Sequence, residues 1–211
     1  MLAGVGCDRH GPGIDPTQAP DPQIEPAESA TDAQQTAVFA GGCFWCTEVV
    51  FEQLAGVSSV VSGYAGGTAQ TANYRDVSSG GSDHAEAIQI IYDPEKITYG
   101  KLLKVFFTVA HDPTQKDRQG YDTGRQYRSA IFYDSEDKKS AAREYIRQLD
   151  ESGAFKRPLA TTLEALDHFY PAEEYHQDYV GHHPDNRYVV INALPKVEKL
   201  RTKFPDIVRG R

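Results

Sequence analysis

Long apolar runs and cysteines are both scarce in this chain of 211 residues. No apolar stretch approaches the roughly 20 residues that a membrane-spanning helix needs, so no such helix is predicted. The three cysteines, Cys7, Cys43 and Cys46, are too few and too clustered for a disulfide-stapled secreted fold. Hydrophobic residues make up 39% of the chain and aromatic residues 10%, which is typical of a globular protein with a core.

Basic residues are also in the minority, because 22 lysines and arginines stand against 30 acidic residues, for a net charge of -8. Proteins that bind nucleic-acid phosphates usually show the opposite balance. We therefore expect no nucleic-acid partner.

Residues 1–35 lack aromatic side chains altogether, and they hold five of the 12 prolines and six acids against one base, Arg9. Such a segment cannot bury enough apolar surface to offset its ordering entropy. We predict a disordered, acidic, proline-rich leader over 1–35 and one folded domain over 36–211. The residues before Cys7 resemble the end of a lipoprotein signal without its charged start and long apolar core. A cytoplasmic location is therefore favoured, with export as a lipoprotein the alternative if the start codon lies upstream.

The order of the predicted elements indicates the fold class. A strand over 37–40 ends at two glycines and is followed at once by a helix over 43–54. Further strands are expected at 57–64, 87–92 and 129–133, an extended segment at 161–170, and helices at 98–110, 135–151, 172–180 and 195–204. Long polar loops separate several of these elements, and loops of this length inside a compact domain are usually functional. This order predicts a two-layer α+β domain.

The sequence Gly-Gly-Cys-Phe-Trp-Cys over residues 41–46 lies between the first strand and the first helix. Free N–H groups and the helix dipole stabilise an anion at Cys43, so we expect a lowered thiol pKa and a nucleophilic sulfur. Cys46 lies one helical turn further on and could attack an oxidised Cys43. The competing interpretation is a pair of small buried cysteines.

Two other chemistries fit a Cys-x-x-Cys pair less well. Thioredoxin-like oxidoreductases normally place small residues or proline between the cysteines, where this chain has Phe44 and Trp45. Zinc could take the cysteines together with histidines such as His176, His182 and His183, but the gap of 130 residues from Cys46 to His176 fits no compact finger. No metal site is therefore predicted.

Three further side chains could take part in acid–base chemistry. Glu86 lies at the mouth of a strand, where partial burial would raise its pKa and suit it to donate a proton. Tyr127 and Asp122 end a polar loop and could orient a polar atom. Each of them alone fits an ordinary structural role equally well.

Four segments, in this order, resemble the A-type methionine sulfoxide reductases, which are peptide-methionine (S)-S-oxide reductases. They are Gly42-Cys43-Phe44-Trp45; Tyr74 with His84-Ala85-Glu86 downstream; His111-Asp112-Pro113-Thr114 with Asp122-x-Gly124-x-Gln126-Tyr127-Arg128-Ser129; and Tyr175-His176-Gln177-Asp178-Tyr179. The resemblance covers residues 37–204, so it implies that 36–211 is the catalytic domain.

The resemblance implies a sandwich of ferredoxin-like type with long functional loops, and it implies a role for each matching residue. Cys43 is the nucleophile, and Glu86 protonates the sulfoxide oxygen. The remaining roles are Tyr74 and Tyr127 as phenols holding that oxygen, Asp122 as a supporting polar residue, and Phe44 and Trp45 as the pocket for the S-methyl group. No metal and no bound organic cofactor are implied.

The implied reaction cycle repairs proteins damaged by oxidative stress. Methionine leaves, Cys43 becomes a sulfenic acid, and a second thiol forms a disulfide that thioredoxin or a similar dithiol opens. This chain has Cys46 where many members have glycine, Asp83 where glycine often precedes the histidine, and no cysteine after position 46. Cys46 is therefore the favoured resolving thiol over Cys7. We expect a monomer, with a general dithiol oxidoreductase and a noncatalytic peptide-binding module as the alternative functions.

Overall fold

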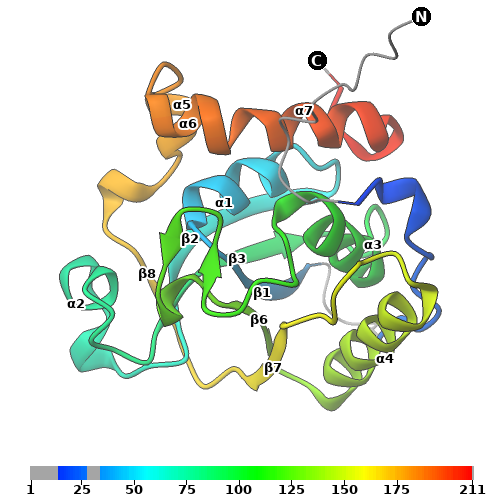
Figure 1. Ribbon diagram of the computed structural model, residues 1–211, viewed down its shortest axis with the longest axis horizontal. Coiled ribbons are helices and arrows are strands. Elements are labelled where there is room, and N and C mark those ends of the chain that lie inside the picture. Colours follow the sequence, from blue (N-terminus) through cyan, green and yellow to red (C-terminus); the bar gives the residue numbers. More distant parts are fainter. Residues whose placement is uncertain (1–13, 28–33, 211) are drawn as a thin grey trace, which may run out of the picture.

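A six-stranded sheet with strand order β7-β6-β1-β3-β2-β8 forms the centre of the computed structural model, which describes residues 14–27 and 34–210 (Figure 1). Its strands are β1 (Gln35–Gly41), β2 (Val57–Ala65), β3 (Ala85–Tyr92), β6 (Ser129–Tyr133), β7 (Thr162–Ala165) and β8 (Phe169–Pro171). Neighbouring strands run antiparallel except β6 and β7, which are parallel. A separate hairpin joins β4 (Arg118–Gln119) to β5 (Asp122–Thr123).

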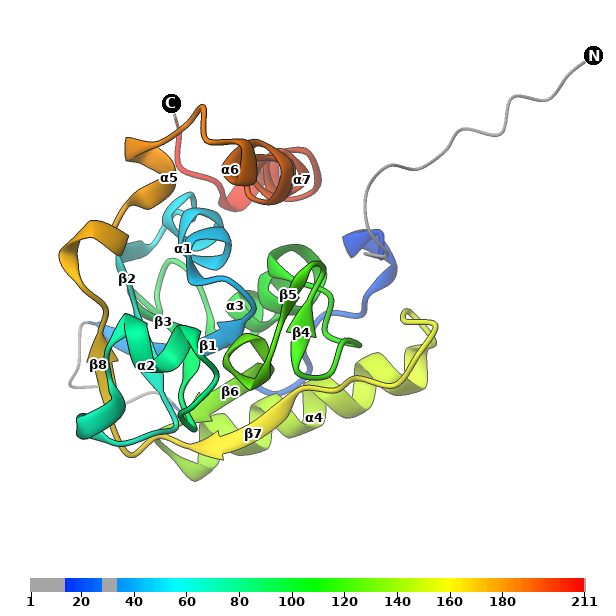
Figure 2. The same ribbon diagram turned by 60° about the vertical axis from the view of Figure 1, so that its left-hand side comes forward.

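Helices pack against this sheet in two groups. They are α1 (Phe44–Glu52), α2 (Tyr74–Ser78), α3 (Tyr99–Val105), α4 (Glu136–Ser152), α5 (Tyr179–His182), α6 (Arg187–Asn192) and α7 (Leu194–Lys203). Helix α1 packs on β2 and β3, and α5 and α7 contact α1 in turn, as Figure 2 shows. Helices α3 and α4 pack together beside β6. No helix among residues 14–27 and 34–210 is long and apolar enough to cross a membrane.

The two faces of the sheet bury different side chains, because successive residues of a strand point to opposite sides. On the helix side, the ring of Phe39 in β1 lies 5.9 Å from the ring of Phe51 in α1 and 6.0 Å from that of Tyr99 in α3. On the other side, Val38 and Ala40 belong to a smaller cluster made mostly of alanines. The larger core therefore lies under the helices, and the predicted combination of one sheet with packed helices is confirmed.

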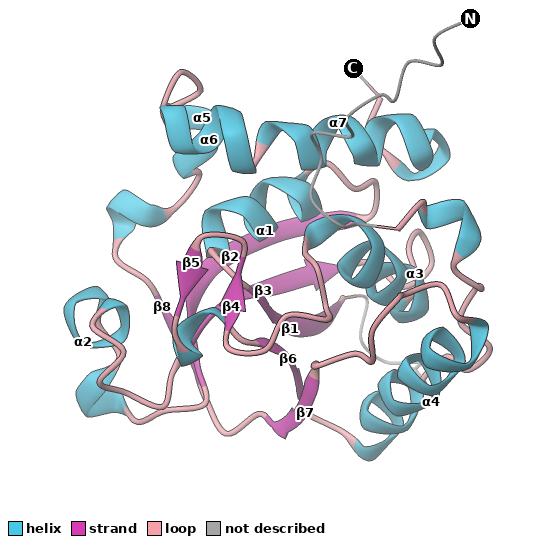
Figure 3. Cartoon of the chain, in the orientation of Figure 1, coloured by secondary structure: helices cyan, strands magenta, loops and turns pink. Residues whose placement is uncertain are grey.

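Most predicted elements are present. The strand at 37–40 and the helix at 43–54 correspond to β1 and α1, and Ser135 caps α4 by accepting a hydrogen bond from the Lys138 backbone at 3.3 Å. Figure 3 shows that mostly loop connects β2 to β3 and α3 to β6.

The predicted helix over 172–180 is wrong. That segment holds a short 3₁₀ turn, Glu174–His176, and then the start of α5. Asp178 adopts a left-handed backbone with φ of 50°, and Gln177 before it is extended. A continuous helix cannot pass through these two conformations. The amphipathic pattern comes instead from aromatic side chains that pack on α1 from an irregular turn.

Residues 14–27 belong to the predicted leader, yet they lie against the folded domain. Glu25 accepts hydrogen bonds from the Gly100 backbone at 2.8 Å and from the Thr98 hydroxyl at 2.7 Å, at the start of α3. Asp21 pairs with Lys104 of α3 at 2.8 Å, and Asp15 with Lys203 of α7 at 2.8 Å. Disorder was predicted for these residues, but residues 14–27 are held against the domain because their carboxylates bind lysine side chains and backbone N–H groups. Residues 1–13, which include Cys7, and residues 28–33 lie outside the described part of the chain.

Candidate active site

A glycine turn places Cys43 at the start of α1. Strand β1 ends at Gly41, and Gly42 then turns the chain with a φ of 88°, a conformation that costs glycine little. Cys43 is the N-cap residue of α1, and Cys46 lies in the first turn of the helix, where its N–H donates to the Cys43 carbonyl at 3.1 Å. The predicted succession of strand, glycine turn and helix is therefore confirmed, with Cys43 at its junction.

Glu86 reaches the same junction from the sheet. It lies on β3 on the same face as Ile88 and Ile90, so its carboxyl group is buried under α1 and is only 2% exposed. The Phe44 backbone N–H at the start of α1 donates to Glu86 Oε2 at 3.1 Å. Burial raises the pKa of Glu86 to about 8, although this hydrogen bond opposes the rise. The carboxyl group is therefore protonated at neutral pH and able to donate a proton.

A cavity of about 160 Å³ opens at this point. It is lined by Cys43, Phe44, Trp45, Tyr74, Glu86, Asp122, Tyr127 and Tyr188. Every residue expected to act on the substrate thus lies around one space, although these residues come from segments far apart in the sequence. Cys46 is buried behind the lining.

The two expected phenols enter the cavity from different loops. Tyr74 begins α2, and its backbone N–H donates to Glu173 Oε1 at 2.9 Å. Tyr127 ends a 3₁₀ turn over Arg125–Tyr127. Burial, and then the nearby Glu86, raise the pKa of both phenols. Both hydroxyl groups therefore stay protonated and can donate hydrogen bonds to an oxygen in the cavity.

An aromatic wall forms one side of the cavity. The Trp45 ring stacks on Tyr179 of α5 with centroids 3.7 Å apart and planes 7° apart. Trp45 Nε1 donates to His176 Nδ1 at 3.2 Å, and the Phe44 ring lies 5.0 Å from the His176 ring. Burial lowers the pKa of His176, which keeps its imidazole neutral and able to accept this bond. His176 thereby fixes the orientation of both aromatic residues that follow Cys43.

The cysteine pair differs in one respect from the prediction. Both thiols are free, with Cys43 8% exposed and Cys46 2% exposed. Burial raises the pKa of Cys43, whereas a hydrogen bond from Cys43 lowers the pKa of Cys46 to about 7. The predicted lowering of the Cys43 pKa is therefore wrong, because burial outweighs the effect of the helix start.

Tyr188 is the site residue that the sequence analysis missed. Its hydroxyl group, presented by α6, donates to Asp122 Oδ2 at 2.5 Å, and its side chain lines the cavity together with Cys43. The edge of its ring faces Trp45, with centroids 6.0 Å apart. No motif pointed to Tyr188, because it lies in a short helix that the sequence analysis did not predict and that carries no paired catalytic residues.

Comparison with known proteins agrees with this geometry. The profile of the family described as "Peptide methionine sulfoxide reductase" matches residues 35–207. The chain belongs to the peptide methionine sulfoxide reductase family. It is 52% identical to the peptide methionine sulfoxide reductase MsrA 2 of Synechocystis sp., over 91% of either chain. It is 48% identical to the peptide methionine sulfoxide reductase MsrA of Natronomonas pharaonis, over 83% of this chain and 98% of that protein.

Solved structures of peptide methionine sulfoxide reductases share the fold. The reduced form of Mxr1 from Saccharomyces cerevisiae superposes with a TM-score of 0.68 at 31% identity, over 78% of this chain and 94% of that one. Methionine sulfoxide reductase A of Corynebacterium diphtheriae superposes with a TM-score of 0.64 at 30% identity, over 79% and 84% of the two chains.

Several motif residues that carry the resemblance to the methionine sulfoxide reductases lie outside the cavity. His84 is fully buried, and its Nε2 lies 3.0 Å from the Thr68 carbonyl. Arg128 donates two hydrogen bonds of 2.9 Å to the Glu164 carboxylate. These side chains hold loops in place. Within the described residues, no group of three or more His, Cys, Asp or Glu side chains is arranged to hold a metal ion.

Proposed function

We propose that this chain reduces the S epimer of methionine sulfoxide, free or within oxidised proteins, to methionine. The observation that carries the proposal is that the buried carboxyl group of Glu86 and the Cys43 thiol line the same small cavity, and burial raises the pKa of Glu86 to about 8. A sulfoxide oxygen is a poor leaving group, so a thiol can displace it only when an acid supplies a proton. The site provides both partners within the family whose members carry this activity in their names.

In the proposed first step, the Cys43 sulfur attacks the sulfoxide sulfur while Glu86 protonates the oxygen. The attack forms a transient bond between the two sulfur atoms. The protonated oxygen then passes from the substrate sulfur to the Cys43 sulfur, so that the substrate's sulfur–oxygen bond and the transient sulfur–sulfur bond both break, methionine leaves, and Cys43 becomes a sulfenic acid. The proton lost by the Cys43 thiol restores the one that Glu86 gave. Methionine sulfoxide is reduced by two electrons and Cys43 is oxidised by two, so the step needs no metal or organic cofactor.

The other cavity residues bind the substrate in the proposed complex. The Tyr74 and Tyr127 hydroxyl groups donate to the sulfoxide oxygen as negative charge develops on it. Asp122 supports the site by accepting the hydrogen bond from Tyr188. Phe44 and Trp45 enclose the S-methyl group.

Regeneration uses Cys46 in this proposal. Its thiol attacks the Cys43 sulfenic acid, which releases water and forms a Cys43–Cys46 disulfide. The two residues lie within the first turn of α1, so their effective concentration is high. Thioredoxin, or a dithiol like it, then reduces the disulfide. Replacing Cys46 by Ser should abolish thioredoxin-driven turnover but leave dithiothreitol-driven turnover, and peptide mapping after one turnover should find the Cys43–Cys46 link. A sulfenic acid that persists, or a Cys43–Cys7 link, would refute this route.

The decisive test supplies each epimer separately, with dithiothreitol as reductant. The wild-type chain should reduce the S epimer and not the R epimer, and Cys43→Ser should abolish the reaction while its circular dichroism stays normal. Substantial turnover by Cys43→Ser would remove Cys43 as the nucleophile. Reduction of insulin disulfides by the Glu86→Gln variant at the wild-type rate, without sulfoxide reduction by the wild type, would instead support a general dithiol oxidoreductase. Binding of oxidised peptides without any turnover would indicate a noncatalytic module.

The proposal also covers the fold classification, the cellular location and the partners of the chain. A ferredoxin-like classification is supported by the order β6-β1-β3-β2 of the four central strands and by the helices that follow β1 and β3. The proposal further takes the chain to be a cytoplasmic monomer that does not bind nucleic acid, and the net charge of -8 supports the last of these features.

A further inference from the structure

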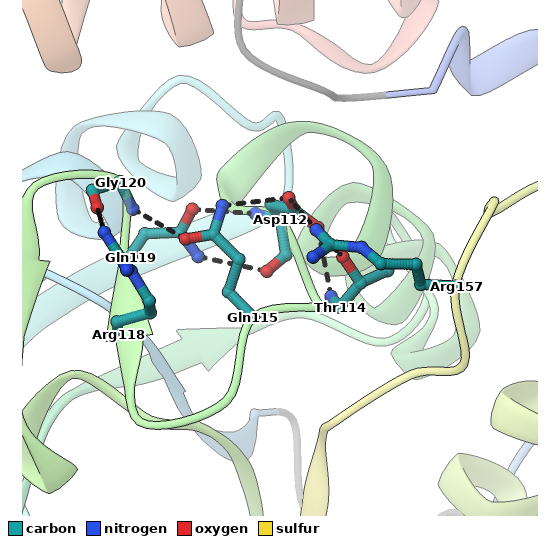
Figure 4. A network of polar contacts seen from close by, with 7 residues as sticks. All are labelled: Asp112, Thr114, Gln115, Arg118, Gln119, Gly120 and Arg157. Atoms are coloured by element: carbon teal, nitrogen blue, oxygen red, sulfur yellow. Dashed lines mark hydrogen bonds and ion pairs between the residues drawn. The ribbon is translucent and has the colours of Figure 1, made fainter.

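A network of hydrogen bonds spans residues 112–120, in a motif that the proposed chemistry does not use (Figure 4). Asp112 Oδ1 accepts from the backbone N–H and the hydroxyl group of Thr114, at 3.0 and 2.7 Å. Asp112 Oδ2 accepts from Gln115 Nε2 at 2.9 Å, and Gln115 Oε1 accepts from the Gly120 backbone N–H at 2.9 Å. One largely buried carboxylate therefore ties the two ends of the segment together.

Gln119 is fixed by this network through both atoms of its amide group. The Asp112 backbone N–H donates to Gln119 Oε1 at 3.1 Å, and Gln119 Nε2 donates to the Asp112 carbonyl at 3.1 Å. Two bonds from one amide to one residue's backbone leave the side chain a single orientation. The Cβ and Cγ atoms of Gln119 are consequently held at a defined position.

That position is directly against Gly42, the residue before Cys43. A Cβ atom placed on Gly42 would lie 2.5 Å from Gln119 Cβ and 2.7 Å from Gln119 Cγ, closer than real Cβ contacts. Gln119 thus packs on the bare backbone of the turn that leads from β1 into α1. Because a glycine with φ of 88° has little conformational preference of its own, a neighbouring side chain must restrict it.

Gln119 also connects this turn to the acidic side of the cavity. In the β4–β5 hairpin, Gln119 pairs across the strands with Asp122. Asp122 accepts the 2.5 Å hydrogen bond from Tyr188, and both side chains line the cavity together with Cys43. Gln119 therefore borders both the turn before the nucleophile and the strand that holds Asp122.

We propose that Gln119 is a positioning residue that holds the Gly42–Cys43 turn in register with Asp122. The proposal rests on the proposed role of Cys43 as the nucleophile. Gln119 touches no substrate atom, and the Asp112 network serves to keep it in place. Its loss should slow the attack on sulfur while leaving the affinity for the substrate little changed.

The test compares Gln119→Ala with Arg118→Ala in the full chain. Arg118 is the preceding residue of β4, is exposed, and points to the opposite side of the strand. Its guanidinium group donates to the Gly120 carbonyl at 2.6 Å rather than to Gln119 or Asp112, so it is the matched control for the contact with Gly42. Methionine formed in a single turnover, without reductant, measures the first step alone. We expect Gln119→Ala to lower this rate by about 10- to 100-fold, the size of effect that a small misplacement of reacting groups causes, with KM changed by less than about twofold. Arg118→Ala should behave as the wild type.

A third variant separates positioning from general stability. Gln119→Met keeps Cβ and Cγ on Gly42 but loses the amide bonds, so its rate should lie clearly above that of Gln119→Ala at matched thermal stability. Equal rates for the two variants, a wild-type rate for Gln119→Ala, or losses that follow the unfolded fraction would each overturn the proposal. A wild-type chain that forms no methionine would refute the proposed function instead, so the two failures are distinguishable.

Discussion

Two long polar loops supply side chains to the Cys43 cavity, and they are held in different ways. Loop 111–127 supplies Asp122 and Tyr127, and hydrogen bonds between its own residues brace it. Loop 66–84 supplies Tyr74. Asn73 caps its short helix α2 by accepting from the Asp76 backbone at 3.0 Å, and residues from other segments hold the rest of the loop. The internal bonds of loop 111–127 thus centre on the buried Asp112 carboxylate, whereas the capping residues of loop 66–84 are only half-buried.

Contacts with residues of other segments are spread along the length of loop 66–84. Glu173 accepts from the Tyr74 backbone, Gln126 Nε2 donates to the Ser78 carbonyl at 3.2 Å, and Arg125 pairs with Asp83 at 3.0 Å in an exposed ion pair. A second cavity of about 300 Å³ lies against this loop. An exposed ion pair contributes little stability, so this loop has few strong restraints of its own. The comparison teaches that loop 66–84 should open more readily than loop 111–127.

The largest expected effect comes from Glu86, which belongs to neither loop. Glu86→Gln removes the proton donor that both loops surround, and the S-sulfoxide reduction rate should fall by about 100- to 10,000-fold, as for loss of a general acid. Because the carboxyl group must be protonated, wild-type kcat/KM should decline as pH rises through about 8, where burial has moved the pKa of Glu86. The variant's residual rate should lack this decline. An unchanged rate in Glu86→Gln would show that a tyrosine of one of the loops, and not Glu86, donates the proton.

The raised pKa of Glu86 can be tested independently through the pH dependence of protein stability. The pKa of Glu86 rises from an ordinary 4.5 to about 8 on folding, so the folded state binds more protons than the unfolded state between these values. Its ionisation therefore costs stability as pH rises through this window. Glu86→Gln should gain stability relative to the wild type between pH 5 and pH 9, as thermal melts would show. A gain that is independent of pH would contradict the burial of an ionisable group.

Smaller effects are expected from the phenols, which sharpen the comparison between the loops. Tyr127→Phe should lower kcat/KM for the S epimer by about 10- to 100-fold, the worth of a hydrogen bond to a charged oxygen. Tyr74→Phe should lose less, because a donor on the less restrained loop realises less of its hydrogen-bond energy in the transition state. Steady-state kinetics of the two single variants would decide. Equal losses would show that Tyr74 is held as firmly as Tyr127.

Local patterns were sufficient to predict the elements that carry the nucleophile. The apolar run before Gly41 and the helical spacing after Cys43 each fit one element type, and both elements are present. The segment around Asp178 could not be predicted in the same way, because its conformation depends on tertiary contacts such as the stacking of Tyr179 on Trp45. Burial patterns there reflect packing on α1 rather than a helix of their own.

Site residues that share a short segment, such as Cys43 and Cys46, could be predicted from a local motif. Isolated residues such as Tyr74 could be predicted only from the resemblance to the methionine sulfoxide reductases. Tyr188 carries no local signal of a catalytic role, since only folding brings its ring against Trp45 at the start of α1. The Cys43 pKa was likewise beyond a local argument: the helix start is visible in the sequence, but the degree of burial and the hydrogen bond to Cys46 are not. Gln119 depends on a contact with Gly42, which no spacing reveals.

The smallest effects should come from replacing one threonine or serine in either loop by alanine. These variants test most directly whether loop 111–127 is braced more firmly than loop 66–84. Thr114→Ala in loop 111–127 removes a donor to the Asp112 carboxylate and an acceptor for Arg157 Nη2, which lies 2.7 Å from the hydroxyl. It should cost about 1 to 2 kcal/mol of unfolding free energy, because these bonds involve charged groups. Ser82→Ala in loop 66–84 should stay within about 0.5 kcal/mol of the wild type, as for substitutions that break no specific interaction. The buried Ser82 Oγ has no hydrogen-bond partner among the described residues. Urea unfolding with a common m-value would measure both variants, and equal losses would show that the two loops are braced alike.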